Sequence, residues 1–538
     1  MAMEQPLPML LSGVSVAILL AVLTGLLALS LNHLVSSWRS PPPRRLPPSP
    51  PGLPVIGHLH LLRPPVHRTF HELASRLGPL VHIRLGSTHC VVASSADVAR
   101  ELIHTHDAAI SGRPVTALTR LFSYGSAGFA FTPYGTQWRF LRRLCVSEVL
   151  SPRTVEQLRP VRRACLAALL HAVLAAADRG EAAVDLTREL IRFSNASIIR
   201  MVASDAPASV ADEAQGLVKA VTALLGAFNV EDYVPLCRGW DFQGLRRTAA
   251  GVHRRFDALL EEMIRHKEAD RREHGRGGAI VEQEGKAGKG SKDLLDLLLE
   301  KAEDPAAEVK LTRDNIKAFI TDVVTAGSDS SAATVEWMLA ELMNHPEAMR
   351  KVREEIDAAV GGGVRIVGEA DLPRLPYLQA AFKETLRLHP GAPIAHRVSA
   401  AEMAVGGGFT VPAGTAVFIN VWAIGRDPAF WEDPLAFRPE RFMPGGGGAA
   451  AGMEPRGQQC QFMPFGGGRR GCPGVGLAQQ SVPAVLAALV QCFDWAPVAG
   501  GETGVVDMEE SSVGLVCARK QPLVLRPTAR LNPFPAVV

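Results

Sequence analysis

The chain has 538 residues, of which 47% are hydrophobic and 21% are charged, with a formal net charge of +3. This length suffices for one large domain or several, and so small a net charge argues against nucleic acid as a partner. The eight cysteines show no CxxC pair or close spacing, which disfavours a zinc site, an iron–sulfur site or a disulfide framework. We therefore predict that the seven cysteines other than Cys472 are buried, reduced thiols.

The first distinctive segment is an uncharged, strongly apolar run from Met9 to Leu31. About 20 such residues span a bilayer as one helix. Glu4 precedes the run and three arginines follow it before residue 46, so the positive-inside rule places its C-terminal side in the cytosol. We therefore predict an N-terminal membrane anchor over residues 1–36, with a cleaved signal peptide as the alternative.

A proline-rich stretch, Pro41–Gly57, follows the apolar run. Proline fixes φ and blocks helix continuation, so this stretch is predicted to be a stiff, extended spacer. We assign residues 37–57 to a hinge that holds a single large body, residues 58–538, away from the anchor.

The body combines strand-like and helical patterns, with helices in the majority. Strand-like patterns occur at Leu80–Leu85, His89–Ala93, Val405–Asn420 and Gly514–Leu525. Helical patterns include Arg162–Ala177 and the longest candidate, Leu311–Leu342. Polar, glycine-rich stretches at Arg271–Gly290 and Gly445–Gly457 predict loops. The expected fold is mainly α with small β-sheets.

The longest predicted helix contains the polar sequence AGSDSS, which begins at Ala326. A glycine, an acid and adjacent hydroxyls are costly inside a packed helix, and the neighbouring valines predict that this helix is buried. A hydroxyl can divert a backbone carbonyl and open the helix locally, which makes room for a small ligand or water. Asp329 and Ser330 are therefore candidate functional groups, and a solvated polar patch on a surface helix is the alternative.

The most specific motif is the sequence FGGGRRGCPG, which runs from Phe465 to Gly474 and contains Cys472. Its glycines allow tight turns and a close approach of backbone to a flat cofactor, and its two arginines bring positive charge. A helical pattern begins just after the cysteine, where N–H groups and the helix dipole favour a thiolate that can ligate iron. A glycine-rich surface loop with a chance cysteine is the alternative.

This motif resembles the haem-binding loop of cytochromes P450, and the resemblance covers essentially the whole chain. It implies the P450 fold preceded by one N-terminal transmembrane helix, with haem b bound in a catalytic domain at residues 58–538. The anchor and hinge are similar to those of microsomal members. That similarity implies a single-pass protein of the endoplasmic reticulum that contacts membrane lipid, faces the cytosol and has NADPH–cytochrome P450 reductase as its partner.

The resemblance also implies roles for individual residues. Asp329 and Ser330 match the acid–alcohol pair that relays protons, although the family usually has threonine where Ser330 stands. Serine keeps the hydroxyl but loses a methyl group that helps to orient it. Glu384, Arg387 and Arg441 resemble a Glu–Arg–Arg network that fixes the haem loop. The implied haem-binding residues are Phe465, Gly466 and the axial ligand Cys472, with Trp138, Arg142, Arg397 and Arg470 near the propionates.

Family placement further suggests a substrate pocket with mostly apolar and small side chains. The candidate contacts are Phe122, Phe228, Val324, Ala326, Ile394 and Val513. A pocket of this composition suits a flat, mostly apolar molecule with few hydroxyl groups.

Three segments resemble a narrower plant group of flavonoid-oxidising P450s: Asn229–Pro235, Ala326–Ala332 and Leu375–Pro393. That group includes flavone synthase II, flavanone 2-hydroxylase and isoflavone synthase. Within it we expect oxidation of a flavanone such as naringenin at carbon 2, with O2 and NADPH-derived electrons, to a flavone or a 2-hydroxyflavanone. The alternative is an isoflavone synthase or another plant phenylpropanoid or terpenoid hydroxylase.

Two functions of other classes also stay open. One is a haem-thiolate isomerase or lyase that needs no reductase, which the Asp329–Ser330 pair disfavours because such enzymes need no proton relay. The other is a membrane-anchored haem protein that only binds or scaffolds.

Overall fold

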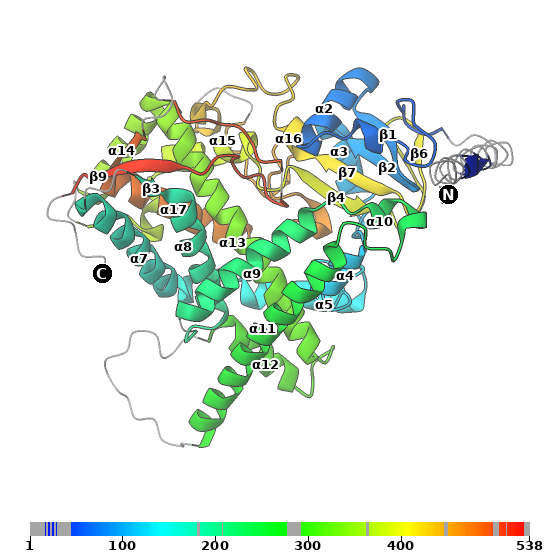
Figure 1. The fold of residues 1–538 in the computed structure, drawn as a ribbon. Coiled ribbons are helices and arrows are strands. Elements are labelled where there is room, and N and C mark those ends of the chain that lie inside the picture. The colour runs from blue at the N-terminus through cyan, green and yellow to red at the C-terminus, as the bar shows by residue number, and fades with distance from the viewer. Residues whose placement is uncertain are drawn as a thin grey trace, which may run out of the picture.

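The computed structural model describes residues 45–531 except 180–182, 207, 277–291, 362–364, 446–449, 499–504 and 513. It also describes six isolated residues between positions 17 and 28, all helical. Most of the predicted anchor, and Val513 among the predicted substrate contacts, therefore lie outside the described residues. The described body is mainly helical with small sheets, as predicted (Figure 1).

Helices and strands alternate in the N-terminal part and helices dominate the middle. The helices are α2 Val66–Leu77, α3 Ala96–Arg100, α4 Ala117–Phe122, α5 Thr136–Leu144, α6 Pro152–Gln157, α7 Arg159–Asp178, α8 Leu186–Val202, α9 Ala208–Gly226, α10 Val230–Tyr233, α11 Leu245–Arg276, α12 Leu294–Glu303, α13 Arg313–Asn344, α14 Pro346–Val360, α15 Pro376–Leu388, α16 Val421–Ile424 and α17 Val475–Cys492. The strands are β1 Leu80–Leu85, β2 Thr88–Ala93, β3 Val184–Asp185, β4 Ile394–Val398, β5 Met403–Val405, β6 Phe409–Val411, β7 Ala416–Asn420, β8 Phe493–Pro497 and β9 Val524–Ala529.

The largest sheet lies at one end of the molecule and has the strand order β1-β2-β7-β4 (Figure 1). β1 and β2 form the predicted antiparallel hairpin, and β2 then pairs in parallel with β7, which pairs antiparallel with β4. The strand-like region Val405–Asn420 divides into the end of β5, β6 and β7. This sheet places β4, which follows α15 in the chain, beside the middle of the body.

Two sequence predictions about boundaries are wrong. The predicted loop Arg271–Gly290 begins too early, because α11 continues to Arg276 on a run of charged side chains that suit an exposed helix. The late strand begins at Val524 rather than at Gly514, because turns and an isolated bridge between Glu510 and Arg519 occupy most of the preceding segment.

All eight cysteines lie in the described part of the chain and carry free thiols, as their spacing predicts. Six of them are buried, whereas Cys237 is only half-buried, so the expectation of seven buried thiols is wrong by one residue. Cys472 has an accessible surface, and its position is described below.

The long helix α13 forms the centre of the body and packs against α8, α9, α15 and α17. Thr312 caps its N-terminus, since its side chain accepts a hydrogen bond from the backbone N–H of Asn315. The first half of α13 joins a hydrophobic core with α9, α11 and α12, and its second half joins another core with α14, α15 and α17. The polar AGSDSS segment therefore lies where two cores meet on one buried helix.

Two of the described helices, α7 and α17, are long and apolar enough to cross a bilayer. Both pack inside the body: α7 lies against α8 and β9, and most of α17 belongs to the core shared with α13. Their apolar composition is explained by this packing.

A buried ion cluster connects α15 to the chain that follows β7. Glu384 accepts two hydrogen bonds of 2.7 Å from Arg387 and one of 3.2 Å from Arg441. Arg387 also donates to the carbonyl oxygens of Gly425, at 2.7 Å, and Ala436, at 3.0 Å. The predicted network of Glu384, Arg387 and Arg441 is thus formed, and in it one carboxylate compensates two guanidinium groups. The network lies outside the wall of the cavity described below.

Replacement of Glu384 by glutamine should destabilise the fold strongly, because it leaves two buried arginines without a compensating charge. We expect the free energy of unfolding to fall by about 3–5 kcal/mol in chemical denaturation. Glu354→Gln, which removes an exposed partner of Arg350, is the matched control and should leave the free energy of unfolding nearly unchanged. Equal stability of the two variants would contradict a structural role for the cluster.

Candidate active site

A cavity of about 1450 Å³ lies between α13, β4 and the loop that carries Cys472. Ligand pockets usually enclose about 300–1,000 Å³, so this volume accommodates a flat cofactor together with a second molecule. Its wall combines segments that are far apart in the sequence. Among the predicted site residues, the wall contains Trp138, Arg142, Ala326, Ser330, Ile394, Arg397, Phe465, Gly466, Arg470 and Cys472.

The cysteine loop folds back on itself, so that Phe465 and Cys472 are neighbours. The N–H of Cys472 donates to the carbonyl oxygen of Phe465 at 2.9 Å. Gly466 and Gly468 have φ values of +68° and +64°, in the left-handed region that glycine tolerates best. A Cβ atom on Gly468 would also lie 2.4 Å from Oδ1 of Asp107. These two glycines are therefore required for the loop to close and to present the thiol to the cavity.

The Cys472 thiol is surrounded by protein, and its accessible surface faces the cavity. Burial raises the pKa of this thiol above its ordinary value, against the opposing effects of the Gly474 N–H and the Arg142 guanidinium. The start of α17 and the nearby arginine thus reduce the cost of a thiolate without abolishing it. A metal cation bound to the sulfur would supply the remaining compensation, because coordination deprotonates a thiol outright.

Four arginines from different elements line the same cavity: Arg113, Arg142, Arg397 and Arg470. Within the described chain none of them forms an ion pair with a carboxylate. Burial and mutual repulsion lower the pKa of Arg470 to about 9 and that of Arg113 to about 10. Such a concentration of buried positive charge calls for anionic groups in the cavity.

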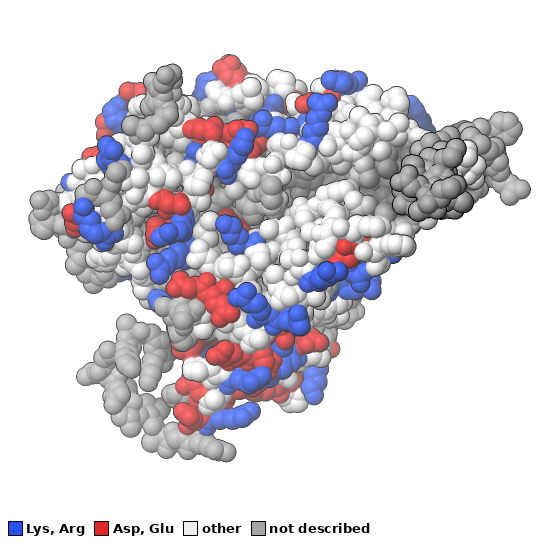
Figure 2. All heavy atoms as spheres, viewed as in Figure 1, with Lys and Arg blue, Asp and Glu red and all other residues white. Residues whose placement is uncertain are grey.

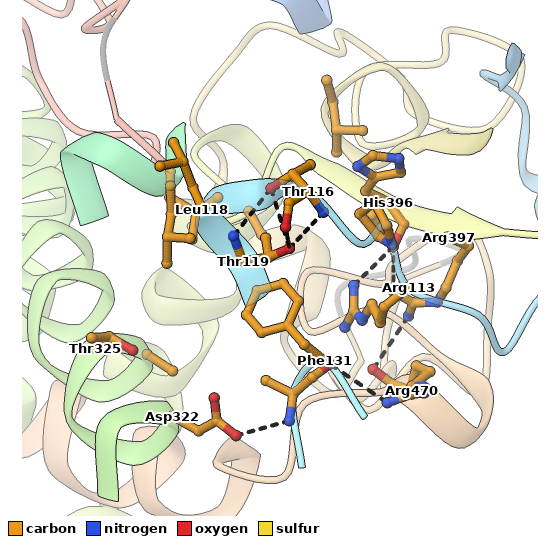
Figure 3. A pocket seen from close by; sticks show the side chains of 18 of the residues that line it. Arg113, Thr116, Leu118, Thr119, Phe131, Asp322, Thr325, His396, Arg397 and Arg470 are labelled. Carbon is orange, nitrogen blue, oxygen red and sulfur yellow. Dashed lines mark hydrogen bonds between the residues drawn. The ribbon is translucent and has the colours of Figure 1, made fainter. Parts of the chain in front are cut away.

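These arginines are held by backbone carbonyls rather than by acids. Arg113 donates to the carbonyl oxygen of His396 at 2.8 Å, and Arg397 donates to that of Arg470 at 3.2 Å (Figure 3). Arg142 donates to the carbonyl oxygen of Gly471 at 2.6 Å. Sequence reasoning missed Arg113, because this residue belongs to no local motif.

Trp138 packs against one of these arginines, Arg470. The Arg470 guanidinium lies 4.6 Å from the centre of the Trp138 ring, a cation–π distance. The indole N–H donates to the carbonyl oxygen of Phe129 at 3.1 Å. Trp138 therefore orients Arg470, while its own N–H is already engaged within the protein.

The structure orients Asp329 and Ser330 differently. Ser330 lines the cavity, and its hydroxyl donates to the carbonyl oxygen of Ala326 at 2.7 Å. Asp329 lies outside the cavity wall and accepts a hydrogen bond of 2.9 Å from Thr222 on α9, and burial raises its pKa. Helix α13 continues through this segment without interruption, so the expected local opening is not present in the described helix.

The predicted substrate contacts divide into two groups. Ala326 and Ile394 line the cavity. Phe122 and Val324 belong to the hydrophobic core next to α9 and α11, and neither residue lines the cavity. Phe228 is 46% exposed and stacks on Tyr233 at a centroid distance of 5.2 Å, outside the cavity wall.

Comparison with known proteins agrees with this architecture. Residues 47–525 match the family model described as Cytochrome P450. The chain is 70% identical over 495 residues to cytochrome P450 93G1 of Oryza sativa subsp. japonica, covering 92% of each chain. It is 44% identical to 3,9-dihydroxypterocarpan 6A-monooxygenase of Glycine max, covering 93% of this chain and 96% of that one. A solved zebrafish cytochrome P450 structure with progesterone superposes with a TM-score of 0.69 at 26% identity, covering 87% and 100%.

The chain therefore belongs to the cytochrome P450 family, a class of monooxygenases whose haem iron is held by a cysteine thiolate. Within that family its relatives place it in the plant group numbered 93. The cavity fits a haem, because one thiol faces it and four arginines without carboxylate partners in the described chain can bind two propionates. When bound, the haem supplies the oxidising chemistry, and the thiolate donates electron density to its iron.

The chain's own groups can be assigned to parts of this task. Cys472 would hold the iron, and the cluster of arginines would bind the propionates. The Ser330 hydroxyl is one group on α13 that can hold or pass a proton at the cavity wall. Asp329, whose pKa is raised by burial, lies next to Ser330 in the chain but faces α9.

Replacement of Cys472 by alanine should abolish thiolate-ligated haem and activity, because Cys472 is the cysteine in the cavity wall. The carbon monoxide difference spectrum of the reduced protein measures this ligation. Cys237→Ala, which changes a half-buried cysteine outside the cavity wall, should leave the spectrum unchanged. A normal thiolate band in Cys472→Ala would refute the assignment.

Replacement of Ser330 by alanine should increase the share of NADPH electrons released as hydrogen peroxide, because it removes the hydroxyl that faces the cavity. We expect a several-fold increase, which is smaller than the factor of about 10²–10⁴ that positioned proton transfer contributes to catalysis. Ser330→Thr keeps the hydroxyl and should couple at least as well as the natural protein. The same peroxide yield in Ser330→Ala and Ser330→Thr would exclude Ser330 from proton delivery.

Proposed function

We propose that this monooxygenase oxidises a flavanone such as naringenin at carbon 2, forming a flavone or a 2-hydroxyflavanone. The observation that supports it best is the apolar part of the cavity wall. The small side chains of Ala326 on α13 and Ala392 before β4 line the cavity together with the larger Leu118 and Phe131, which are labelled in Figure 3. Small residues beside large ones form a slot that admits a planar ring system.

Hydroxyl groups line this part of the cavity, beside the charged Asp322 and Arg113. Thr116 and Thr119 contribute hydroxyls that bond to one another at 3.2 Å, and the Thr325 hydroxyl donates to Thr321 at 2.6 Å (Figure 3). Each retains lone pairs that can accept a hydrogen bond from a phenol. A flavanone, with a mostly apolar ring system and hydroxyls at its periphery, matches this distribution.

The relatives support a substrate of this kind. The Glycine max relative is named for a dihydroxypterocarpan, a fused aromatic ring system with two hydroxyl groups. A flavanone likewise combines aromatic rings, an oxygen heterocycle and phenolic hydroxyl groups. The residues that resemble the flavonoid-oxidising group, Ala326–Ala332 and Leu375–Pro393, contribute to α13 and to the segment next to β4, which line the cavity.

Oxidation at carbon 2 requires one oxygen atom from O2 and two electrons from NADPH. The second oxygen atom leaves as water, and the product carries a hydroxyl group on carbon 2. Loss of water from that product forms the flavone. We infer that NADPH–cytochrome P450 reductase delivers the electrons, as microsomal P450s require.

We also infer that the protein is held on the endoplasmic reticulum membrane with its body in the cytosol. The described chain enters the body at Arg45, whose guanidinium lies 5.2 Å from the ring centre of Phe409 on β6, at the sheet end. Three exposed apolar side chains follow α10: Leu236, Trp240 and Phe242, exposed by 71%, 70% and 67%. Figure 2 shows that charged side chains gather over α11 and α12, whereas the surface near α10 is largely uncharged.

The test is turnover of naringenin by the full-length protein in microsomes with reductase and NADPH. We expect consumption of naringenin that stops without NADPH, with a flavone or 2-hydroxyflavanone as product. Products must be separated before any acid treatment, because acid dehydrates the 2-hydroxyflavanone. No turnover of flavanones, alongside oxidation of another phenylpropanoid or a terpenoid, would refute the proposed substrate. Turnover without NADPH would indicate an isomerase or lyase.

A further inference from the structure

A short backbone segment, residues 128–132, crosses α13 at the edge of the cavity and is bound from both sides. On one side lies Asp322, a carboxylate on α13 that the sequence analysis did not single out. Its Oδ2 accepts the N–H of Ala130 at 2.9 Å (Figure 3), and the neighbouring N–H of Phe129 acts to lower the pKa of this carboxyl. We call residues 128–132 the clamped segment.

On the other side the clamped segment is held by the cysteine loop. Arg470 donates to the carbonyl oxygens of Phe129, at 3.3 Å, and Thr132, at 2.6 Å. Trp138 donates to the same Phe129 oxygen at 3.1 Å. Backbone N–H groups thus face a carboxylate on α13, while backbone C=O groups face a guanidinium next to the haem ligand.

The fit between α13 and the clamped segment depends on Gly128. A Cβ atom at this position would lie 2.2 Å from Oδ2 of Asp322 and 3.0 Å from the carbonyl oxygen of Ala318. The rings of Phe129 and Phe319 pack at a centroid distance of 4.9 Å beside this contact. Any side chain at Gly128 would therefore separate the clamped segment from α13.

Asp322 is costly to keep for stability alone. It is only 6% exposed, and within the described chain no arginine or lysine lies at ion-pair distance from it. Burial raises its pKa to about 7, even though the two N–H groups and the more distant Arg113 favour the anion. A buried acid of this kind is retained more readily for what it positions than for stability.

We propose that Asp322 is a positioning residue that fixes Phe131 in the substrate wall and Arg470 at the propionate site through the clamped segment. Phe131 directly follows Ala130 and its ring enters the cavity, so a shift of the Ala130 backbone moves that ring (Figure 3). The same shift moves the carbonyl groups that hold Arg470. One carboxylate thereby couples the substrate wall to the charge around the haem, whatever the substrate is.

The test uses two variants of the full-length holoprotein and two iron-binding probes. Asp322→Asn removes the charge but keeps the shape, and Gly128→Ala keeps every charge but pushes the segment off α13. Imidazole binds the haem iron alone, whereas 4-phenylimidazole also needs the surrounding wall. In both variants we expect 4-phenylimidazole to bind about tenfold more weakly, the size of one lost charge-assisted hydrogen bond, with imidazole unchanged.

Asp314→Asn, an exposed acid-to-amide change on the same helix, is the matched control and should alter neither affinity. The double variant G128A/D322N should be no worse than the more damaged single variant, because both changes break one contact. Unchanged affinity for 4-phenylimidazole in Asp322→Asn or in Gly128→Ala, with a normal carbon monoxide spectrum, would overturn the proposal. If Asp322→Asn does not retain haem, Gly128→Ala carries the test by itself.

Discussion

The concentration of buried positive charge around the Cys472 thiol is the constraint on which the site depends. Four separate segments contribute Arg113, Arg142, Arg397 and Arg470, and each of these arginines donates hydrogen bonds to backbone carbonyls. Such a group is stable only when anions occupy the space between them, and a haem brings two propionates together with an iron that deprotonates the thiol. Cofactor binding and folding of this region are therefore expected to be strongly linked.

Helix α13 distributes the functions of the cavity along its length. Its buried faces join two hydrophobic cores, so apolar packing fixes the position of the helix independently of its polar groups. Asp322 then binds the clamped segment, Ser330 faces the cavity, and Asp329 bonds to α9. Three polar groups within nine residues thus contact three different parts of the protein, because successive helical residues point in different directions.

Features with a strict local pattern could be predicted from the sequence. The cysteine loop depends on glycines at fixed spacing, and Gly466 and Gly468 have the backbone angles that only glycine adopts readily. The Glu384 cluster followed from its motif, although its contacts reach the chain after β7 rather than the cysteine loop itself. Phe122 and Val324 could not be placed, because an apolar residue has the same signature in a core as in a cavity wall.

The sequence by itself determined the type of chemistry, because the spacing of Cys472 and its neighbouring glycines and arginines resembles the haem-binding loop of cytochromes P450. It also determined the helical fold class and the apolar character of the cavity. Only the tertiary structure decided which charges meet. Arg113 and Asp322 belong to no local motif, and their partners lie far away in the chain. Arg113 donates to His396 on β4, and Asp322 accepts from Ala130, which follows α4. Long-range contacts of this kind arise from packing, which no local pattern encodes.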